Sequence, residues 1–326
     1  MKQIILVTQP EFEKAQTVFN SAEELDCRAA PTNEQELAEC LKQTGSRIAV
    51  LGTHPYNDQL YTALERNSQG SGALIIRFGF GMDNINRALC EQNNITLANT
   101  PVDIQTSVAE LTLFLLGGLL RNISLFNTAI RNNEFTSQRG RELSGKTALI
   151  LGGGKIGLQV AAMLHRGFNV SILLCDSSSE EQWHARNGIS QVDLREIYGV
   201  KKYSQNIDEL LPQADILSIH LPLMDSTRKM IDKRRIALLK HGAFLINTAR
   251  GGIVDEAALF DALATGQLAG AAMDVFAAEP YTPAQPDKDL RILSNMIMTP
   301  HCASDTVEAN NRMATRAVEL ATAFVT

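Results

Sequence analysis

The segment from Thr147 to Asp176 constrains the fold of this chain more than any other stretch. It opens with an apolar run, Ala148 to Leu151, passes through a glycine-rich turn and then follows a helical pattern with one apolar face. Gly167 is placed to stop that helix, and a second apolar run follows from Val170 to Leu174. The pattern predicts a strand, helix, strand unit of about thirty residues and therefore a pair of parallel strands.

Three glycines in the turn, Gly152, Gly154 and Gly157, have the spacing G-x-G-x-x-G. In such a unit the first glycine makes the tight turn, the second lets the backbone approach a pyrophosphate, and the third lets the helix pack close to the strand. Lys155 and Ile156 lie in the first helical turn, whose free N–H groups can hold the pyrophosphate. A glycine-rich turn alone is a weak signal, but the strand before it and the helix after it indicate dinucleotide binding.

Asp176 ends the second strand, nineteen residues after Gly157. A carboxylate at this position accepts hydrogen bonds from the adenosine ribose hydroxyls of NAD and repels the additional phosphate of NADP. The residues that follow are Ser177 to Ser179, with no adjacent arginine. We therefore predict NAD as the cofactor, in preference to NADP.

Composition excludes several other classes of protein. The 326 residues suffice for two domains, and a net charge of −6 argues against nucleic-acid or anionic-membrane partners, which require basic surfaces. The five cysteines are scattered without a C-x-x-C pair or metal-ligand spacing, which predicts buried, reduced thiols in the cytoplasm and no metal. The N-terminus is typical of a first strand and not of a secretory signal, and the most apolar helix, Val108 to Leu120, is too short to cross a bilayer.

Short apolar runs alternate with helical patterns along the rest of the chain, which predicts parallel α/β sheets. We expect a long connecting helix from Asp103 to Asn132, after a break at Asn99-Thr100-Pro101, and a last helix from about Asp305 to Phe324 that returns to the first domain. The other expected strands are 4–7, 48–51, 74–76, 95–97, 214–219, 243–246, 271–273 and 296–298, and the other expected helices lie around 11–25, 207–211 and 256–265.

Polar residues follow the predicted strands of the second half, where parallel sheets bind their ligands. They are His220, Arg250, Asp274 with Glu279 five residues later, and His301. Reduction of a 2-keto acid requires a cation for the carboxylate and carbonyl, which suits Arg250, and a proton donor near neutral pH, which suits His301. Glu279 would orient the imidazole and favour its protonated form.

Each of these residues has a simpler interpretation. A histidine after a strand is more often a loop hydrogen-bonder than a catalyst, Glu279 precedes a proline and suits a turn, and Arg250 precedes two glycines and suits a solvated cap. His220 ends a strand at the cofactor edge, so a cofactor contact there is an open alternative. In the first half, Gly79 and Gly81 bracket Phe80 directly after a strand, which suits either a loop whose N–H groups face a carboxylate or an ordinary tight turn.

At these positions the sequence resembles the D-2-hydroxyacid dehydrogenase family over most of its length. The matching stretches are residues 79–85, 99–101, 107–110, 152–157, 220–222, 247–255, 274–280 and 299–301. The resemblance implies Arg250, Glu279 and His301 as catalytic residues, and the backbone of Gly79, Phe80 and Gly81 as the substrate carboxylate site. It implies cofactor contacts at Ser107, His220, Pro222, Ala249 and Asp274, the last of them to the nicotinamide.

The resemblance also implies the architecture: two Rossmann-like, doubly wound parallel-sheet α/β domains, with the NAD-binding domain inserted into a smaller flavodoxin-like substrate domain. Residues 1–101, completed by 302–326, would form the substrate domain, and residues 102–301 the NAD-binding domain. The region from Asp103 to Asn132 would help to form a homodimer.

Several positions depart from the family pattern: Lys155 replaces a more usual arginine or asparagine, Met224 a threonine and His241 a proline. The loop from Gly52 to Tyr56 lacks the basic residues with which phosphoglycerate dehydrogenases tend to hold the substrate phosphate, and we expect no C-terminal regulatory domain.

The prediction is an NAD-dependent oxidoreductase for a small D-2-hydroxy acid or its 2-keto acid. The alternatives are a dinucleotide-sensing module like the co-repressors of the family, or the same fold acting on 3-phosphoglycerate, formate or phosphite. Formate enzymes of this fold pair the histidine with glutamine, so Glu279 argues against formate.

Overall fold

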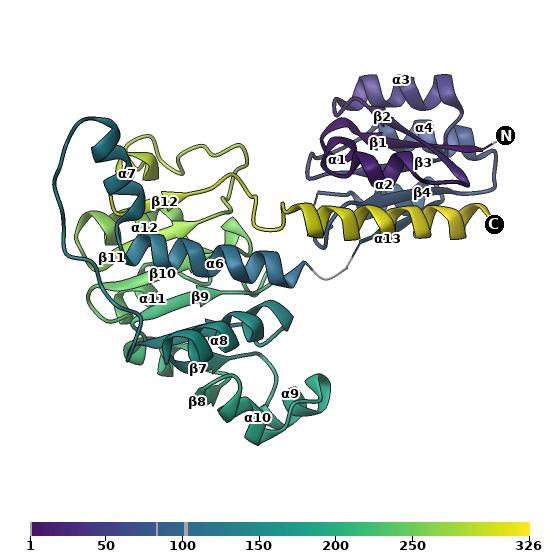
Figure 1. Ribbon diagram of the computed structural model, residues 1–326. Helices are drawn as coiled ribbons and strands as arrows, with labels where there is room; N and C mark the ends of the chain where they lie inside the picture. The colour runs from purple at the N-terminus through teal and green to yellow at the C-terminus, as the bar shows by residue number, and fades with distance from the viewer. Residues whose placement is uncertain (1, 83, 101–103) are drawn as a thin grey trace. The chain divides into compact units, whose positions relative to one another are not determined.

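The computed structural model describes residues 2–82, 84–100 and 104–326. The chain divides into two compact units, Met1–Ile104 with Asp305–Thr326 (unit 1) and Gln105–Ser304 (unit 2) (Figure 1). Three sequence expectations fall outside the described residues: the break at Pro101, the helix start at Asp103, and Asp83 of the loop after the fourth strand.

Unit 1 contains a five-stranded sheet in the order β2-β1-β3-β4-β5, in which every pair is parallel. This is the flavodoxin-like order, whose connections change direction between β1 and β3. The strands are β1 Gln3–Thr8, β2 Leu25–Ala30, β3 Ile48–Leu51, β4 Ala73–Arg77 and β5 Ile95–Asn99. The helices are α1 Gln9–Lys14, α2 Gln16–Asn20, α3 Glu34–Thr44, α4 Gln59–Ser68, α5 Arg87–Gln92 and α13 Val307–Val325.

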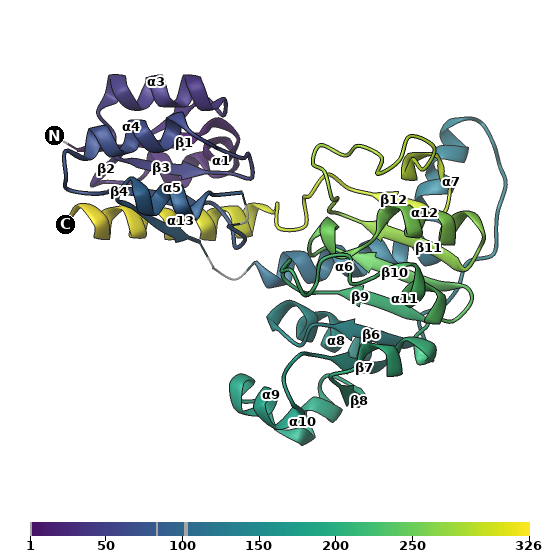
Figure 2. The ribbon, with the colours of Figure 1, turned by 180° about the vertical axis from the view of Figure 1, so that it is seen from behind.

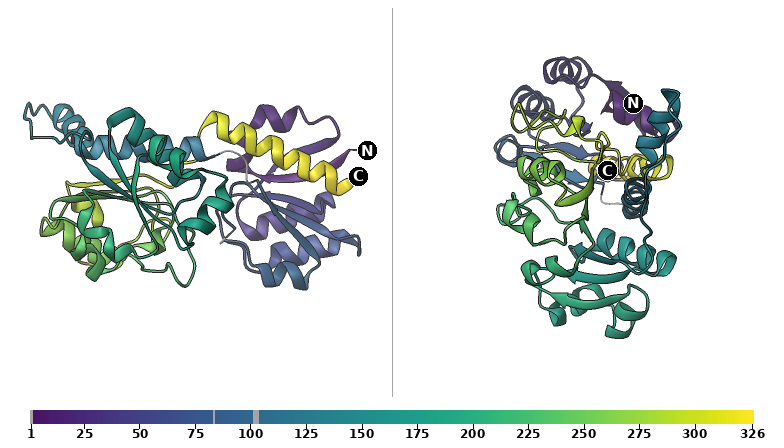
Figure 3. Two further views of the ribbon diagram at one scale, coloured as in Figure 1. Left: turned by 90° about the horizontal axis from the view of Figure 1, so that it is seen from below. Right: turned by 90° about the vertical axis from the view of Figure 1, so that its left-hand side faces the viewer.

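Both faces of the unit 1 sheet are buried. One face packs against α3, α4 and α5, which Figure 2 shows in front of the strands. The opposite face packs against α1, α2 and α13, where Met313, Ala314 and Ala317 contact side chains such as Ile5 and Val50. The last helix therefore completes unit 1 from the far end of the chain, and both termini lie at the same end of this unit (Figure 3).

Unit 2 contains a seven-stranded parallel sheet in the order β12-β11-β10-β9-β6-β7-β8. This is the Rossmann order with one additional strand, and its connections change direction between β6 and β9. The strands are β6 Thr147–Leu151, β7 Ser171–Cys175, β8 Val200–Ser204, β9 Ile216–Ile219, β10 Ala243–Asn247, β11 Leu268–Met273 and β12 Met296–Met298. The α-helices are α6 Gln105–Leu120, α7 Ile123–Arg131, α8 Lys155–Phe168, α9 Glu180–Asn187, α10 Gln191–Glu196, α11 Lys233–Leu238 and α12 Glu256–Ala264. The short 3-10 helices are η1 Ile207–Glu209, η2 Leu211–Gln213, η3 Gly251–Ile253 and η4 Leu290–Ile292.

Alternate residues of the unit 2 strands enter two separate cores. In β6, Leu149 and Leu151 face the helices α11 and α12, whereas Ala148 and Ile150 face α6, α8 and α9. A sheet that is covered on both faces explains why these strands are short apolar runs without alternation in the sequence. It also leaves the strand ends as the places where polar side chains collect.

Two strands were absent from the sequence prediction, β2 and β8, and both are edge strands of their sheets. Their sequences, LDCRAA and VKKYS, contain half-buried and exposed polar residues, because an edge strand is only partly covered. The other two edge strands, β5 and β12, were predicted, because their sequences ITLAN and MIM contain apolar runs.

Four helix predictions were wrong in detail. The expected helix 11–25 breaks at Ala15 into α1 and α2, and the expected long connector breaks at Asn122, whose φ is 54°, into α6 and α7. Helix α8 does not stop at Gly167 but continues to Phe168, because Asn169 adopts the left-handed conformation and caps it. Residues around 207–211 form short 3-10 helices around Pro212 and not an α-helix.

The five cysteines are free. Cys90 and Cys175 are buried, whereas the other three are half-buried and not fully buried as predicted. Among the described residues no single helix has the length and hydropathy to cross a membrane; α6 and α7 meet both criteria only as a pair bent by 63°.

Candidate active site

The glycine loop between β6 and α8 has the geometry expected of a phosphate-binding turn. Gly152 has a φ of 108°, and a side chain there would overlap the carbonyl of His220. A Cβ at Gly157 would overlap the carbonyl oxygen of Gly152, so only glycine lets α8 approach the loop this closely. Gly154 is the N-cap of α8, has no side-chain cap and faces open space. The loop thus fits a dinucleotide pyrophosphate at the helix N-terminus, beside the exposed Lys155 and the half-buried Ile156.

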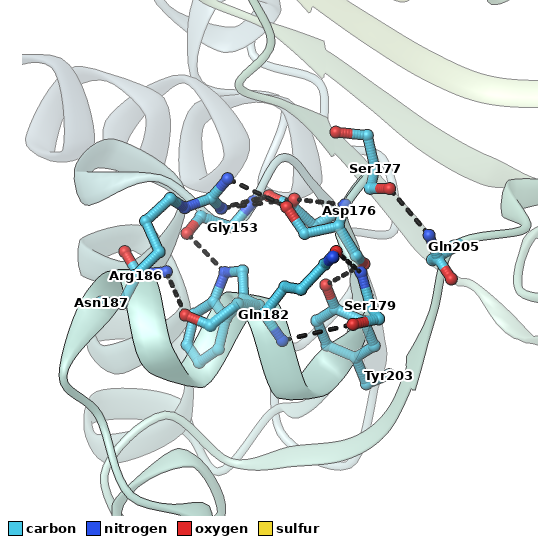
Figure 4. A network of polar contacts seen from close by, with 11 residues as sticks. Gly153, Asp176, Ser177, Ser179, Gln182, Arg186, Asn187, Tyr203 and Gln205 are labelled. Carbon is cyan, nitrogen blue, oxygen red and sulfur yellow. Dashed lines mark hydrogen bonds and ion pairs between the residues drawn. The ribbon is translucent and has the colours of Figure 1, made fainter.

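Asp176 follows β7 and lies beside this loop (Figure 4). Its Oδ2 accepts the N–H of Gly153 at 3.0 Å and its Oδ1 accepts the N–H of Ser178 at 3.1 Å. Burial alone would raise the pKa of Asp176, but these two N–H groups and the charge of Arg186 outweigh burial and lower it. The carboxylate is therefore ionised at neutral pH.

The residues directly after Asp176, Ser177 to Ser179, include no arginine. Helix α9 supplies one, because Arg186 Nη2 lies 3.2 Å from Asp176 Oδ2. No role was predicted for Trp183 on the same helix, whose Nε1 donates to Gly153 O at 2.9 Å. The sequence signal for both residues is their spacing: Trp183 and Arg186 are three positions apart on the helix after β7 and therefore lie on the same helix face.

His301 and Glu279 form the central pair of the site. His301 Nδ1 lies 2.7 Å from Glu279 Oε2, and Glu279 Oε1 accepts the N–H of Phe276 at 3.0 Å. Both side chains remain accessible, with exposed fractions of 32% and 36%. Burial acts to raise the pKa of Glu279, but the hydrogen bond with His301, the N–H of Phe276 and the charge of Arg250 act in the opposite direction. The net result is a lowered pKa.

Arg250 follows β10, the strand next to β11 in the sheet. Its Nη1 donates to Ala249 O at 2.7 Å, and its backbone carbonyl accepts from the buried Asn247 side chain at 2.9 Å. The next residue, Gly251, packs directly against the backbone of Phe276. This contact brings the loop that carries Arg250 against the loop that carries Glu279.

Asp274 was expected to contact the nicotinamide, but its carboxylate has other partners in the structure. The residue is fully buried, and its oxygens accept the hydroxyl of Thr299 at 2.6 Å and the N–H groups of Cys302 at 2.9 Å and Ala303 at 2.8 Å. Its carbonyl accepts the N–H of His301 at 2.7 Å. Asp274 thus holds the loop on both sides of His301, which itself has a left-handed φ of 54°.

His220 differs from His301 in its surroundings. Its Nε2 lies 2.8 Å from Ser218 Oγ, and desolvation lowers the pKa of His220 to about 3. The imidazole is therefore neutral at physiological pH and suits a hydrogen-bonding role at the end of β9. Of the two histidines at this edge, only His301 faces a carboxylate.

The remaining predicted cofactor residues of unit 2 lie in different environments. Ser107 is buried on α6, Ala249 is half-buried after β10, and Pro222 is exposed after β9 with its carbonyl accepting from Thr227 at 2.7 Å. Ala249 and Pro222 belong to the same strand-end edge as the glycine loop, since all seven strands are parallel.

In unit 1 the loop after β4 contains Gly79, Phe80 and Gly81. Gly79 has a φ of 133°, and its N–H donates to Thr100 Oγ1 at 2.8 Å. That bond leaves the N–H groups of Phe80 and Gly81 as the candidates for an external anion. Phe80 is 64% exposed, and the guanidinium of the buried Arg77, for which no role was predicted, packs against Gly79.

The chain is similar to known proteins over most of its length. The family model for the NAD-binding domain of D-isomer specific 2-hydroxyacid dehydrogenases matches residues 113–303, within unit 2. The D-3-phosphoglycerate dehydrogenase of Methanocaldococcus jannaschii is 33% identical over 97% of this chain, but the chain spans only 56% of that protein's length. The hydroxypyruvate reductase of Thermotoga maritima is 30% identical over 96% of this chain and 95% of its own length.

A solved structure shows the same fold. The D-lactate dehydrogenase of Aquifex aeolicus, complexed with NAD and lactic acid, is 26% identical to this chain. It superposes with a TM-score of 0.78 over 98% of this chain and 95% of its own. The Rossmann sheet, glycine loop and ionised Asp176 are features of an NAD-binding domain, as the family model describes. The chain belongs to the D-isomer specific 2-hydroxyacid dehydrogenase family.

Proposed function

We propose that this protein transfers a hydride between NAD and a small D-2-hydroxy acid or its 2-keto acid. His301 is the general acid and base, Glu279 orients it, and Arg250 binds the substrate. The observation that supports these roles most directly is the 2.7 Å contact between His301 Nδ1 and Glu279 Oε2. Because Nδ1 faces the carboxylate, Nε2 is the nitrogen that remains to exchange a proton with substrate.

In the direction of reduction, the guanidinium of Arg250 binds the 2-keto acid and polarises its carbonyl. NAD in its reduced form, when bound, supplies the hydride that forms the new C–H bond at the carbonyl carbon. His301 Nε2 gives its proton to the carbonyl oxygen as negative charge develops there, which completes the hydroxyl group. The ionised Glu279 stabilises the imidazolium before this transfer and holds the ring in place.

The proposed cofactor contacts belong to the strand-end edge of unit 2. The backbone of Gly152, Gly154 and Gly157, with Lys155 and Ile156, binds the pyrophosphate, and Asp176 binds the adenosine ribose. The further proposed contacts are Ser107, His220, Pro222 and Ala249. For Asp274 we propose a positioning role, since its oxygens already accept three donors of the loop that carries His301.

The proposed substrate carboxylate donors in unit 1 are the N–H groups of Phe80 and Gly81, while Gly79 shapes the loop. We further propose that the substrate carries no phosphate. The loop from Gly52 to Tyr56 contains no lysine or arginine, and the carboxylate of the buried Glu11 packs against Gly52. A carboxylate at this position repels a phosphate, so hydroxypyruvate and glyoxylate suit the loop better than phosphohydroxypyruvate.

The test is a panel of glyoxylate, hydroxypyruvate, pyruvate and phosphohydroxypyruvate, with NADH oxidation followed by absorbance. We expect turnover of at least one substrate without phosphate, and a loss of about 10²-fold or more in kcat/KM for His301→Ala. His241→Ala removes an exposed histidine as the matched control and should retain full activity. Full activity of His301→Ala would refute the assigned chemistry, and NADH binding without turnover of any substrate would favour a sensing module.

We also propose a homodimer that involves α6, α7 and the segment directly after α7. Apolar side chains in this region are exposed, with fractions of 69% for Phe114, 59% for Ile123, 56% for Ile130 and 96% for Phe135. Such a patch is typical of an interface between proteins. Light scattering of the wild-type protein should give twice the mass of the chain, and Ile130→Asp should reduce it to a monomer; a monomeric wild type would contradict the proposal.

A further inference from the structure

Helix α9 presents one face to the cofactor loop. Trp183 and Arg186 are three residues apart and therefore share that face. Trp183 is fully buried and bonds to Gly153 O, which fixes the helix against the glycine loop. One turn further on, Arg186 reaches the carboxylate of Asp176, and its Nη1 donates to Ser178 Oγ at 3.0 Å (Figure 4).

The lone-pair positions of the Asp176 carboxylate are all occupied by donors of the described residues. A carboxylate offers about four lone-pair sites. The N–H groups of Gly153 and Ser178 occupy one on each oxygen, and Arg186 Nη2 lies 3.3 Å from Oδ1 and 3.2 Å from Oδ2. The two hydroxyls of an adenosine ribose need the positions that Arg186 covers, so the arginine and the ribose compete for them.

The two partners of this ion pair differ in exposure and in their bonds to the backbone. The side chain of Asp176 is 10% exposed and is bonded to the backbone, whereas that of Arg186 is 52% exposed. Because the guanidinium end of this pair lies largely in solvent, the arginine can turn away from Asp176 when a neutral ribose diol arrives. The carboxylate stays in place.

A ribose that carries a 2′-phosphate has a different effect on the same pair. The phosphate is repelled by Asp176 but attracted by the guanidinium beside it, whose planar array of N–H groups matches phosphate oxygens. Arg186 can bond to the phosphate without leaving Asp176, and the hydroxyl of Ser178 already lies within 3.0 Å of the guanidinium. The repulsion on which a preference for NAD depends is thus offset by this side chain.

We propose that Arg186 determines cofactor specificity and allows the adenosine-ribose subsite to accept NADP(H) as well as NAD(H). It leaves Asp176 when NAD(H) binds and remains there to hold the 2′-phosphate when NADP(H) binds. This inference rests on the proposed cofactor role of Asp176, and it adds a residue to the ribose subsite that the serines after Asp176 do not supply.

The test measures binding and needs no catalysis. Trp183 is the only tryptophan of the chain and bonds to the cofactor loop, so its fluorescence reports occupation of this subsite. The wild type, Arg186→Ala, Arg186→Lys and Arg195→Ala are titrated with NADH, NADPH, 5′-AMP and adenosine 2′,5′-bisphosphate. Arg195 is the matched control, because it is an exposed arginine on the neighbouring helix α10.

We expect the wild type to bind NADPH and the bisphosphate, with affinities that fall as salt increases. Arg186→Ala should weaken both by about tenfold or more and leave NADH and 5′-AMP unchanged or tighter, because it removes a charge-assisted bond to phosphate only. Arg186→Lys should restore part of the loss, and Arg195→Ala should match the wild type.

Two results would overturn the inference while leaving the proposed function intact: a wild type that binds NADH but neither 2′-phosphorylated ligand, or an Arg186→Ala variant that loses affinity equally for ligands with and without the 2′-phosphate. Failure of all four ligands to bind would instead contradict the assignment of the cofactor site, and the inference with it.

Discussion

Replacement of Asp274 by alanine tests whether this carboxylate anchors the loop that carries His301. The substitution removes the acceptor of two backbone N–H groups, those of Cys302 and Ala303, and of the Thr299 hydroxyl. The hydroxyl can rotate to another acceptor, but the N–H groups are fixed, and Asp274 and Ala303 are buried. At about 1–2 kcal/mol for each fixed donor left without a partner, the cost is about 2–4 kcal/mol.

The assay is urea unfolding of the wild type, Asp274→Ala and a control, Asp287→Ala, in which an exposed carboxylate is removed. With a urea dependence of about 2 kcal/mol per M, Asp274→Ala should lower the unfolding midpoint by roughly 1–2 M, while the control should stay within about 0.5 kcal/mol of the wild type. NADH affinity should fall much less than kcat, since the loop holds His301. An unchanged midpoint with a selective loss of NADH affinity would refute the anchoring role and favour the nicotinamide contact expected from the sequence.

Three further predictions concern the glycine loop, the His301 pair and acid stability. Gly157→Ala should abolish NADH binding in a fluorescence titration, because its Cβ overlaps the Gly152 carbonyl; Gly167→Ala, where a Cβ meets nothing within 4 Å, should bind normally. Glu279→Gln should lower kcat/KM by about tenfold or more with little change in the urea midpoint, because His301 loses the carboxylate that holds its ring, and a wild-type kcat/KM would contradict this role. The folded-state pKa values of Glu279 and Asp176 lie below their ordinary values of 4.5 and 3.8. Each ionised carboxylate therefore stabilises the folded protein above its ordinary pKa, and this stabilisation is lost as pH falls through the lowered pKa. Urea midpoints that do not fall in that pH window would exclude this linkage.

The inner strands and the glycine loop could be predicted because their causes are local. A strand covered on both faces, such as β6, is visible in the sequence as an apolar run. A turn that admits only glycine at Gly152 and Gly157 is visible as glycine spacing. The edge strands β2 and β8 form no apolar run, because part of each strand faces solvent and carries polar residues. At the sheet edges the outcome depended on composition, since the apolar β5 and β12 were predicted and the polar β2 and β8 were not.

The partners of the site residues depend on contacts between distant segments and were harder to predict. Asp274 ends β11, but the groups that occupy its carboxylate come from residues 25 to 29 positions later. The arginine that meets Asp176 lies ten residues away, on a helix whose orientation is set by the buried Trp183. Sequence patterns place a carboxylate at a strand end, but packing decides which donors reach it.

The two histidines at the strand ends show how much the assignment of chemistry depends on such partners. His220 and His301 both follow a strand of the same parallel sheet, so their positions alone do not show which of them is the acid and base. His220 lies beside the neutral hydroxyl of Ser218, and desolvation lowers its pKa to about 3, so its imidazole is not in the cationic form at neutral pH. His301 lies beside Glu279, whose lowered pKa keeps a negative charge against the ring. A general acid needs a partner for its protonated form, and the carboxylate of Glu279 beside the ring therefore favours His301 for this role.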